Sequence, residues 1–178
     1  MLKKILAILL VVVLAFGGFV GSRPSDYKIE RSIVIDGPIE SVYPEVVMFR
    51  RWGNWSPWAH LDPNMAVEYG GPKGGLGSTY HWKGNDKVGE GRMTMTGALK
   101  DELVQIKLEF IKPWAQVSQT EFRFKPEGPG QTRVTWTMTG KHDFVGKLFA
   151  LFMDMDKMVG TDFEKGLAAL KARGERDN

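Results

Sequence analysis

Apolar and polar residues alternate with a period of two along several stretches between residues 27 and 140. Successive side chains of a β-strand point to opposite faces, so this alternation predicts strands with one apolar face. The first stretch, YKIERSIVI at 27–35, has one face made of Tyr27, Ile29, Ile33 and Ile35. Five further stretches occur at 77–84, 90–99, 102–110, 118–126 and 132–140. Because short turn-like segments join them, we expect an antiparallel meander.

A short helix is predicted between the first strand and the meander. The segment IESVYPEVVMF at 39–49 follows Pro38, a residue suited to opening a helix. Pro44 lies in its middle and is expected to kink or split it. The segment GGPKGGLG at 70–77 lacks the phosphate-loop spacing, because Lys73 lies inside it, and it is interpreted as a turn between strands.

The apolar spacing changes to three and four at the C-terminal end, which is the period of an amphipathic helix. We expect one helix from about residue 145 to 173, which at ~1.5 Å per residue would reach roughly 40 Å and cross a whole sheet. Thr161 and Glu164 have capping-box spacing, so this helix can restart after Gly160. Phe152 is on the apolar side and is expected to face Trp136 of the sheet.

The first 23 residues form an apolar segment with a basic start. Lys3 and Lys4 precede residues 5–22, which carry no charge. Such a run is at the lower limit for crossing a ~30 Å hydrocarbon core. We expect an uncleaved, single-pass transmembrane anchor at 1–23 and a folded domain at 24–178. The alternatives are a cleaved secretory signal and a helix buried in the domain.

The lysines predict which side of the membrane the domain occupies. Lys3 and Lys4 are expected to stay in the cytoplasm, which places the domain on the extracytoplasmic side. Basic residues beyond the apolar segment, among them Arg23 and Lys28, weaken this asymmetry.

Composition excludes several classes of function. The chain has 178 residues, 43% hydrophobic and 25% charged, with a net charge of +3. Its basic residues are interleaved with acidic ones and form no stripe with stacking aromatic residues, so we expect no nucleic-acid partner. The absence of cysteine excludes disulfides, thiolate metal sites, thiol nucleophiles and a lipid-modified cysteine.

The order of elements resembles a known superfamily. The segments that carry the resemblance are YKIERSIVIDGPIESVY, WGNWSPW, GLGSTYHWKG, TRVTWTMTG and GTDFEKGLAALK, within roughly residues 26–173. They resemble the START-like (SRPBCC) superfamily in its polyketide cyclase/dehydrase-like branch. The resemblance implies an α+β helix-grip fold, a curved antiparallel sheet wrapped around a long C-terminal helix with a deep cavity between them. The superfamily includes lipid carriers, cyclases and binding proteins, so it does not specify one function.

Three tryptophans within seven residues, Trp52, Trp55 and Trp58, are the most unusual local feature. Pro57 prevents one regular helix through all three, so we expect a lid over the open end of the grip. Their indole N–H groups would then reach water or a ligand. The alternative is that these rings fill the core.

The predicted ligand cavity is lined by large aromatic and methionine side chains, which suit a flat or greasy ligand. This predicted set is Trp52, Trp55, Trp58, Tyr69, Tyr80, Trp82, Met93, Met95, Phe110, Phe122, Trp136, Met138 and Phe152.

Candidate catalytic groups are few. His60 and Asp62 flank Leu61 and are a possible general-base pair, against the alternative of polar loop residues. Glu68 is a candidate carboxylate at a pocket rim. Alternation points His81 away from the face of Tyr80 and Trp82. Asp154 and Asp156 lack calcium-loop spacing and are interpreted as a solvated helix edge, and no metal ligand, cofactor or catalytic residue is assigned.

The sequence is compatible with three functions. The first is a membrane-tethered, non-catalytic binding domain for a hydrophobic small molecule or lipid. The second is a polyketide cyclase/dehydrase-like enzyme. The third is a structural or regulatory partner of an envelope protein, with no ligand.

Overall fold

The computed structural model describes residues 1–176. Its helices are α1 (Leu2–Gly21), α2 (Ile39–Val47), the 3-10 helix η1 (Phe49–Asn54), α3 (Phe144–Ala150) and α4 (Met155–Gly174). Its strands are β1 (Asp26–Ile35), β2 (Ala66–Gly70), β3 (Thr79–Lys83), β4 (Glu90–Leu99), β5 (Leu103–Lys112), β6 (Gln116–Gly128) and β7 (Gln131–Lys141).

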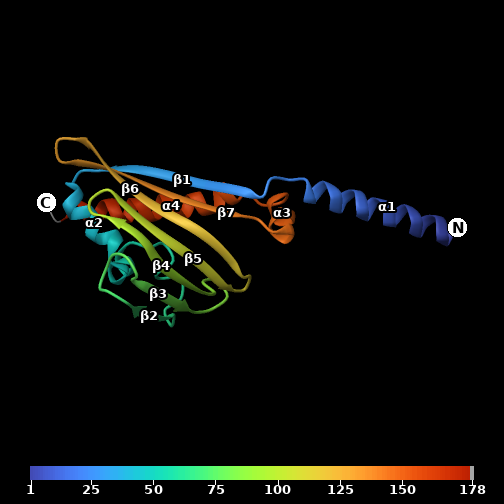
Figure 1. Ribbon diagram of the computed structural model, residues 1–178, viewed down its shortest axis with the longest axis horizontal. Coiled ribbons are helices and arrows are strands. Elements are labelled where there is room, and N and C mark those ends of the chain that lie inside the picture. Colours follow the sequence, from blue (N-terminus) through green and yellow to red (C-terminus); the bar gives the residue numbers. More distant parts are fainter. Residues whose placement is uncertain (177–178) are drawn as a thin grey trace.

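The strands form one antiparallel sheet in the order β1-β7-β6-β5-β4-β3-β2. The predicted meander is confirmed from β3 to β7, and β1 pairs with β7 over its full length (Figure 1). The edge strand β2 was not predicted, because its five residues contain only two alternating apolar positions, Val67 and Tyr69. The predicted helix-grip architecture is confirmed, because the long C-terminal helix lies against one face of this curved sheet.

Alternation along the strands separates an inner face, turned towards α4, from an outer polar face. In β7 the buried positions are Thr132, Val134, Trp136 and Met138. The residues between them, Arg133, Thr135 and Thr137, are polar and face outwards. This regular alternation explains why the strands could be predicted from the sequence.

Glycines on the sheet-facing side of α4 allow the helix to approach the sheet closely. A β-carbon at Gly166 would lie 2.9 Å from Cζ3 of Trp136 and 3.0 Å from Cδ of Pro57. A β-carbon at Gly160 would overlap the guanidinium group of Arg31. Glycine is a poor helix former, so tertiary packing rather than propensity accounts for these residues.

The C-terminal helical region is broken in two, not continuous as predicted. α3 ends at Ala150 and α4 begins at Met155. Asp154 caps α4, its carboxylate accepting a hydrogen bond from the backbone N–H of Lys157 at 2.9 Å. Asp143 caps α3 in the same way through the N–H of Gly146. An N-cap aspartate satisfies an N–H that the helix itself leaves without a partner, so each helix has its own start.

Two expectations are wrong as a result. Phe152 falls in the break, is 77% exposed, and does not face Trp136. Phe163 takes that place, stacked on Trp136 with ring centroids 3.9 Å apart. No helix restarts at Thr161, which lies inside α4 and donates its hydroxyl hydrogen to the carbonyl of Lys157.

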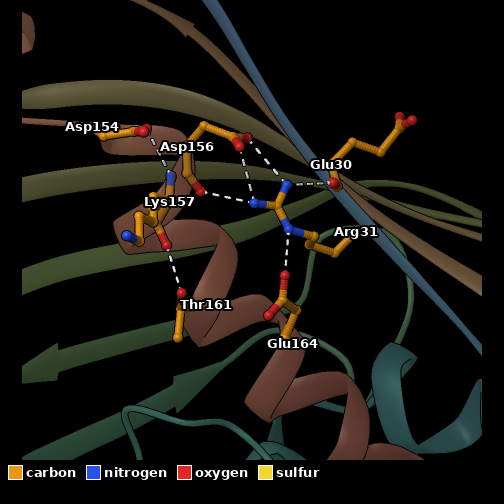
Figure 2. Close-up of polar contacts among 7 residues, drawn as sticks. All are labelled: Glu30, Arg31, Asp154, Asp156, Lys157, Thr161 and Glu164. Atoms are coloured by element: carbon orange, nitrogen blue, oxygen red, sulfur yellow. Dashed lines mark hydrogen bonds and ion pairs between the residues drawn. The ribbon is translucent and has the colours of Figure 1, made fainter.

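Arg31 connects β1 to the first turns of α4 (Figure 2). Its Nε donates to Oε1 of Glu164 at 2.8 Å, and its two other nitrogens donate to the carboxylate of Asp156 at 3.1 and 3.0 Å. The backbone carbonyl of Asp156 also accepts from Nη2 at 3.0 Å. Asp156 is exposed at the edge of α4, as expected, and it is in addition a partner of the sheet through Arg31. The hydrogen bond from Arg31 lowers the pKa of the Asp156 carboxyl below its ordinary value.

The Arg31→Met variant is expected to raise the pKa of Asp156 back into the ordinary range of an aspartate. A lowered carboxyl pKa contributes stability above the unfolded-state value, and this stability is lost as pH falls through the native value. The variant should lack this acid-dependent part of its stability and should exchange amide hydrogens faster at 155–165. NMR titration and hydrogen exchange measure both effects.

The matched control is Arg133→Met, which removes the partner of Glu127 on the outer face of the sheet, near the β6–β7 turn. This control should leave the titration of Asp156 unaltered. An unchanged pKa of Asp156 in Arg31→Met would contradict the assigned pairing.

The N-terminal helix α1 projects from one end of the domain (Figure 1). Within residues 1–176 it is the single helix long and apolar enough to cross a membrane, with a mean hydropathy of 2.5. Only its last turn meets the domain: Val20 is fully buried, and Nζ of Lys147 donates to the carbonyl of Gly21 at 2.9 Å. The link to β1 consists of residues 22–25.

Candidate functional site

The space between the sheet and α4 is occupied by an interlocked group of aromatic rings. Trp136 lies at its centre, with Phe163 stacked on it and Phe122 at 4.7 Å between centroids. Trp55 and Trp58 meet Trp136 edge-on at 5.7 and 5.8 Å. Edge-to-face and stacked pairs stabilise such a cluster beyond simple burial, by about 1 kcal/mol each.

Trp52 and Trp55 belong to the core, so the lid interpretation is wrong for both. They are 4% and 2% exposed. Their indole N–H groups donate to the carbonyls of Val46 and Glu45, at 2.8 and 3.0 Å. These carbonyls are in the last turn of α2, where a helix leaves its carbonyl groups without internal partners. The indoles therefore complete the end of α2 and do not reach water or a ligand.

Trp58 keeps partial exposure in the turn that follows η1. It contacts Phe163 of α4 with centroids 6.4 Å apart, in addition to Trp136. Of the three tryptophans, it is the one whose position at the margin of the interior still fits contact with a bound molecule.

A second row of aromatic rings crosses the other half of the inner face. Tyr69, Tyr80 and Trp82 follow one another at 5.5 and 6.0 Å, and Phe110 lies 6.3 Å beyond Trp82. Tyr80 and Phe110 are half-buried, whereas Tyr69 is exposed at the edge. Burial raises the pKa of Tyr80 to about 12, so its hydroxyl stays protonated at neutral pH.

The methionines complete this surface. Met93 is paired with Tyr80 across β3 and β4, Met95 is buried in β4, and Met138 is buried in β7. Thus the structure brings together eleven of the thirteen residues expected to line a cavity, in the core or packed against it. Tyr69 joins them through Tyr80 at the exposed edge, and Phe152 lies outside. Their role in holding a ligand stays a prediction.

Gly91 lets the ring of Trp82 lie flat against the sheet. A β-carbon there would overlap the ring, at 2.3 Å from Cη2. The indole N–H of Trp82 donates to the carbonyl of Val88 at 2.9 Å, which fixes its orientation. The ring is therefore held in one orientation against the inner face.

The inner face also carries a polar group that was not predicted from the sequence, formed by Tyr27, Gln116 and Ser118. The hydroxyls of Tyr27 and Ser118 lie 2.8 Å apart, and the amide of Gln116 donates to the Tyr27 hydroxyl at 2.9 Å. Tyr27 crosses over Gly140, where a β-carbon would overlap its ring. The alternation that puts Phe122 on the inner face also puts Ser118 and Gln116 there, so the signal was present in the sequence. Such polar atoms in an apolar surface are suited to orienting a ligand.

The candidate base pair His60 and Asp62 does not form an acid–base site. His60 is exposed, and both oxygens of Asp62 accept hydrogen bonds from backbone N–H groups, those of Asn64 at 2.9 Å and Asn85 at 2.7 Å. Asp62 therefore joins two loops, in agreement with the alternative of polar loop residues.

The remaining polar candidates lie on the outer face of the sheet. His81 points away from Tyr80 and Trp82, as predicted, and lies 3.8 Å from Glu68 and 3.6 Å from Glu90. Glu68 thus projects away from the inner face, and its expected place at a pocket rim is wrong. No group of three or more possible metal ligands occurs within residues 1–176.

The resemblance implies a deep cavity between the sheet and the C-terminal helix, and two hollows of the structure lie in other places. One, of about 590 Å³, lies over the polar outer face and is lined by charged and threonine side chains such as Arg123, Arg133 and Thr137. The other, of about 50 Å³, lies beside Tyr69 and the glycine-rich turn at 70–73. A space of this second size holds no more than a water molecule or two.

A curved antiparallel sheet that grips one C-terminal helix through an aromatic interior defines the helix-grip class of the START-like superfamily. Residues 26–175 match the family described as polyketide cyclase / dehydrase and lipid transport. The chain belongs to this family. No curated protein shows significant sequence similarity to it.

Solved structures share the fold at low sequence identity. The di-domain ARO/CYC StfQ from the steffimycin biosynthetic pathway is 11% identical with a TM-score of 0.63, over 86% of this chain and 52% of StfQ. The Mll3558 protein from Rhizobium loti is 17% identical with a TM-score of 0.59, over 83% of this chain and 96% of its own. Ara h 8.0201 is 10% identical with a TM-score of 0.56, over 85% of this chain and 99% of its own. At these identities the likeness concerns the fold alone.

Proposed function

We propose that the protein is a membrane-tethered binding domain that holds a hydrophobic small molecule or lipid on the inner face of its sheet, without catalysis. The observation that carries the proposal is the aromatic and methionine surface around Tyr80 and Phe110, next to a small polar group at Tyr27. This combination supplies apolar burial and a few orienting hydrogen bonds, which is the composition of a typical site for a small apolar ligand.

The buried carboxylates favour binding over catalysis. Within residues 1–176 they are Glu45 and Asp62. Glu45 lies 2.7 Å from Arg51 and 3.8 Å from Arg173, and Asp62 is held by backbone amides. A general acid or base must be within reach of the substrate and free to exchange its proton. Neither carboxylate meets this requirement, which supports a binding function over the cyclase alternative.

The membrane attachment in this proposal rests on α1. Its twenty residues match the thickness of the hydrocarbon core, about 30 Å at ~1.5 Å per residue. Lys3 and Lys4 at its start support a cytoplasmic N-terminus and a domain on the extracytoplasmic side.

The test is a titration of residues 24–178 with the fluorescent probe 8-anilino-1-naphthalenesulfonate, separated from α1 so that no membrane or detergent takes up the probe. The Tyr80→Ala/Phe110→Ala variant should bind the probe at least about tenfold more weakly, because ~1.4 kcal/mol of lost apolar contact is a factor of ten. Mass spectrometry of molecules that co-purify with the wild type would identify the natural ligand.

The matched control is Leu99→Ala, which removes an exposed apolar side chain at the opposite end of the sheet. Its affinity for the probe should equal that of the wild type. Equal affinity in the Tyr80/Phe110 variant would contradict the proposed site. A wild type that binds no probe would favour the third function, a partner protein with a packed interior.

A further inference from the structure

Large apolar side chains are exposed together at the end of the domain from which α1 leaves. They come from the β5–β6 turn, from α3 and from the break before α4. We call them the α3 surface, formed by Trp114, Phe144, Phe149, Phe152 and Met153. Trp114 is 65% and Phe152 77% exposed. Trp114 and Phe149 contact each other at 6.1 Å between centroids, so the turn and the helix form one continuous surface.

This concentration differs from the rest of the domain. Leu61, Leu76 and Leu99 are exposed singly, as isolated surface residues commonly are. Aromatic rings elsewhere in the domain are directed inwards, as Trp136 and Phe122 are, except for Tyr69 at the exposed edge of the sheet. A contiguous exposed apolar surface marks a place of contact with a partner or a membrane.

The position of the α3 surface relative to α1 indicates the occupant. α3 packs against the last turn of α1, where Val20 is fully buried and Lys147 donates to the carbonyl of Gly21. If α1 crosses the hydrocarbon core, as the proposed function requires, its last turn lies at the boundary between lipid and water. α3 then lies at the same depth, beside the end of α1 (Figure 1).

The chemistry of the α3 surface fits that boundary. Tryptophan and phenylalanine are favoured where the acyl chains meet the headgroups. Asp143 and Asp154 are engaged as N-caps by backbone N–H groups, and Asp156 is paired with Arg31. Lys157 is exposed beside the apolar residues, and its positive charge suits contact with anionic headgroups.

We propose that the α3 surface inserts into the bilayer leaflet next to the end of α1, so that the domain contacts the membrane twice. This inference rests on the proposed membrane attachment. The two contacts hold the domain with the α1 end of its sheet against the lipid and the β6–β7 turn pointing away.

The absence of cysteine allows a direct test with single labels in the full chain. Phe152→Cys, Val11→Cys and Leu99→Cys are each labelled with an environment-sensitive fluorophore. The proteins are reconstituted in vesicles of phosphatidylcholine and phosphatidylglycerol, with or without nitroxide-labelled lipid. We expect the labels at Val11 and Phe152 to lose most of their fluorescence to the nitroxide and the label at Leu99 to lose none.

Each other result overturns the inference in a recognisable way. Quenching at Val11 with none at Phe152 leaves the anchor in place and removes the second contact. A label at Phe152 that is shielded from water but not quenched would show that a protein, such as a second copy, covers the surface. No quenching at Val11 would refute the membrane attachment itself, and the inference with it.

A second measurement avoids any effect of the label. Brominated lipids should quench part of the tryptophan fluorescence of the unlabelled full chain, and Trp114→Phe should abolish that part. Equal quenching in wild type and Trp114→Phe would also contradict the insertion.

Discussion

Replacing Trp136 with alanine is expected to lower the free energy of unfolding by about 3–5 kcal/mol. The ring is 2% exposed, stacks on Phe163 at 3.9 Å, and contacts Phe122 at 4.7 Å. Its N–H also donates to the buried hydroxyl of Thr120 at 3.1 Å, which would lose this partner. Thermal denaturation should show a decrease of roughly 6–20 °C, at about 2–4 °C per kcal/mol for a domain of this size.

Phe152→Ala is the matched control for this prediction. It also removes an aromatic ring, but this ring is exposed in the break before α4. It should change stability by less than about 0.5 kcal/mol, as exposed substitutions usually do. A large loss of stability in Phe152→Ala, with little change in Trp136→Ala, would reverse the assignment of the ring that packs on the sheet.

Removing residues 1–23 is expected to move the protein from the membrane fraction to the soluble fraction while the domain still unfolds cooperatively. The apolar side chains of α1 are exposed along nearly its whole length, and only its last turn packs on the domain. The aromatic core, the sheet and α4 contain no residue of α1, so they should remain intact. Fractionation of cells and a thermal melt of residues 24–178 measure the two effects.

Two outcomes would contradict this prediction. Aggregation of residues 24–178 without a cooperative melt would mean that α1 is part of the folding unit. A full chain found in the soluble fraction with an intact N-terminus would refute the anchor. The intact mass of the membrane-bound protein distinguishes the anchor from a cleaved signal.

The sheet could be predicted because burial on one face repeats at every second residue. The same alternation also places one charged residue of β1 on the inner face. Arg31 occupies the inner-face position between Ile29 and Ile33, and a charge at such a position needs a partner, here Asp156 and Glu164. The partner could not be predicted, because it depends on how α4 crosses β1.

The break between α3 and α4 escaped the periodicity argument. Apolar residues continue at helical spacing through Phe152, although the backbone is not helical there. The N-cap residues Asp143 and Asp154 were the better signal, because they provide a partner for N–H groups at a helix start. Spacing alone therefore identifies an apolar face but not the continuity of the helix that carries it.

The candidate site was predicted in composition but not in geometry. The large rings lie on the inner face as expected, because hydrophobic burial is readable residue by residue. The roles of Trp52 and Trp55 depend on the carbonyls of Val46 and Glu45, which the turn between α2 and η1 brings to the indoles. Such contacts arise only when the chain is folded.

The link at residues 22–25 limits where the domain can be. Four residues reach at most about 14 Å when fully extended, and the carbonyl of Ser25 is already held by the N–H of His142 at 2.8 Å. In the proposed arrangement, such a short connection keeps the α3 surface at a millimolar or higher effective concentration next to the lipid. A contact too weak to recruit the free domain to vesicles would then be nearly always formed in the intact chain. Lengthening the link with flexible residues should release this contact while the domain stays attached.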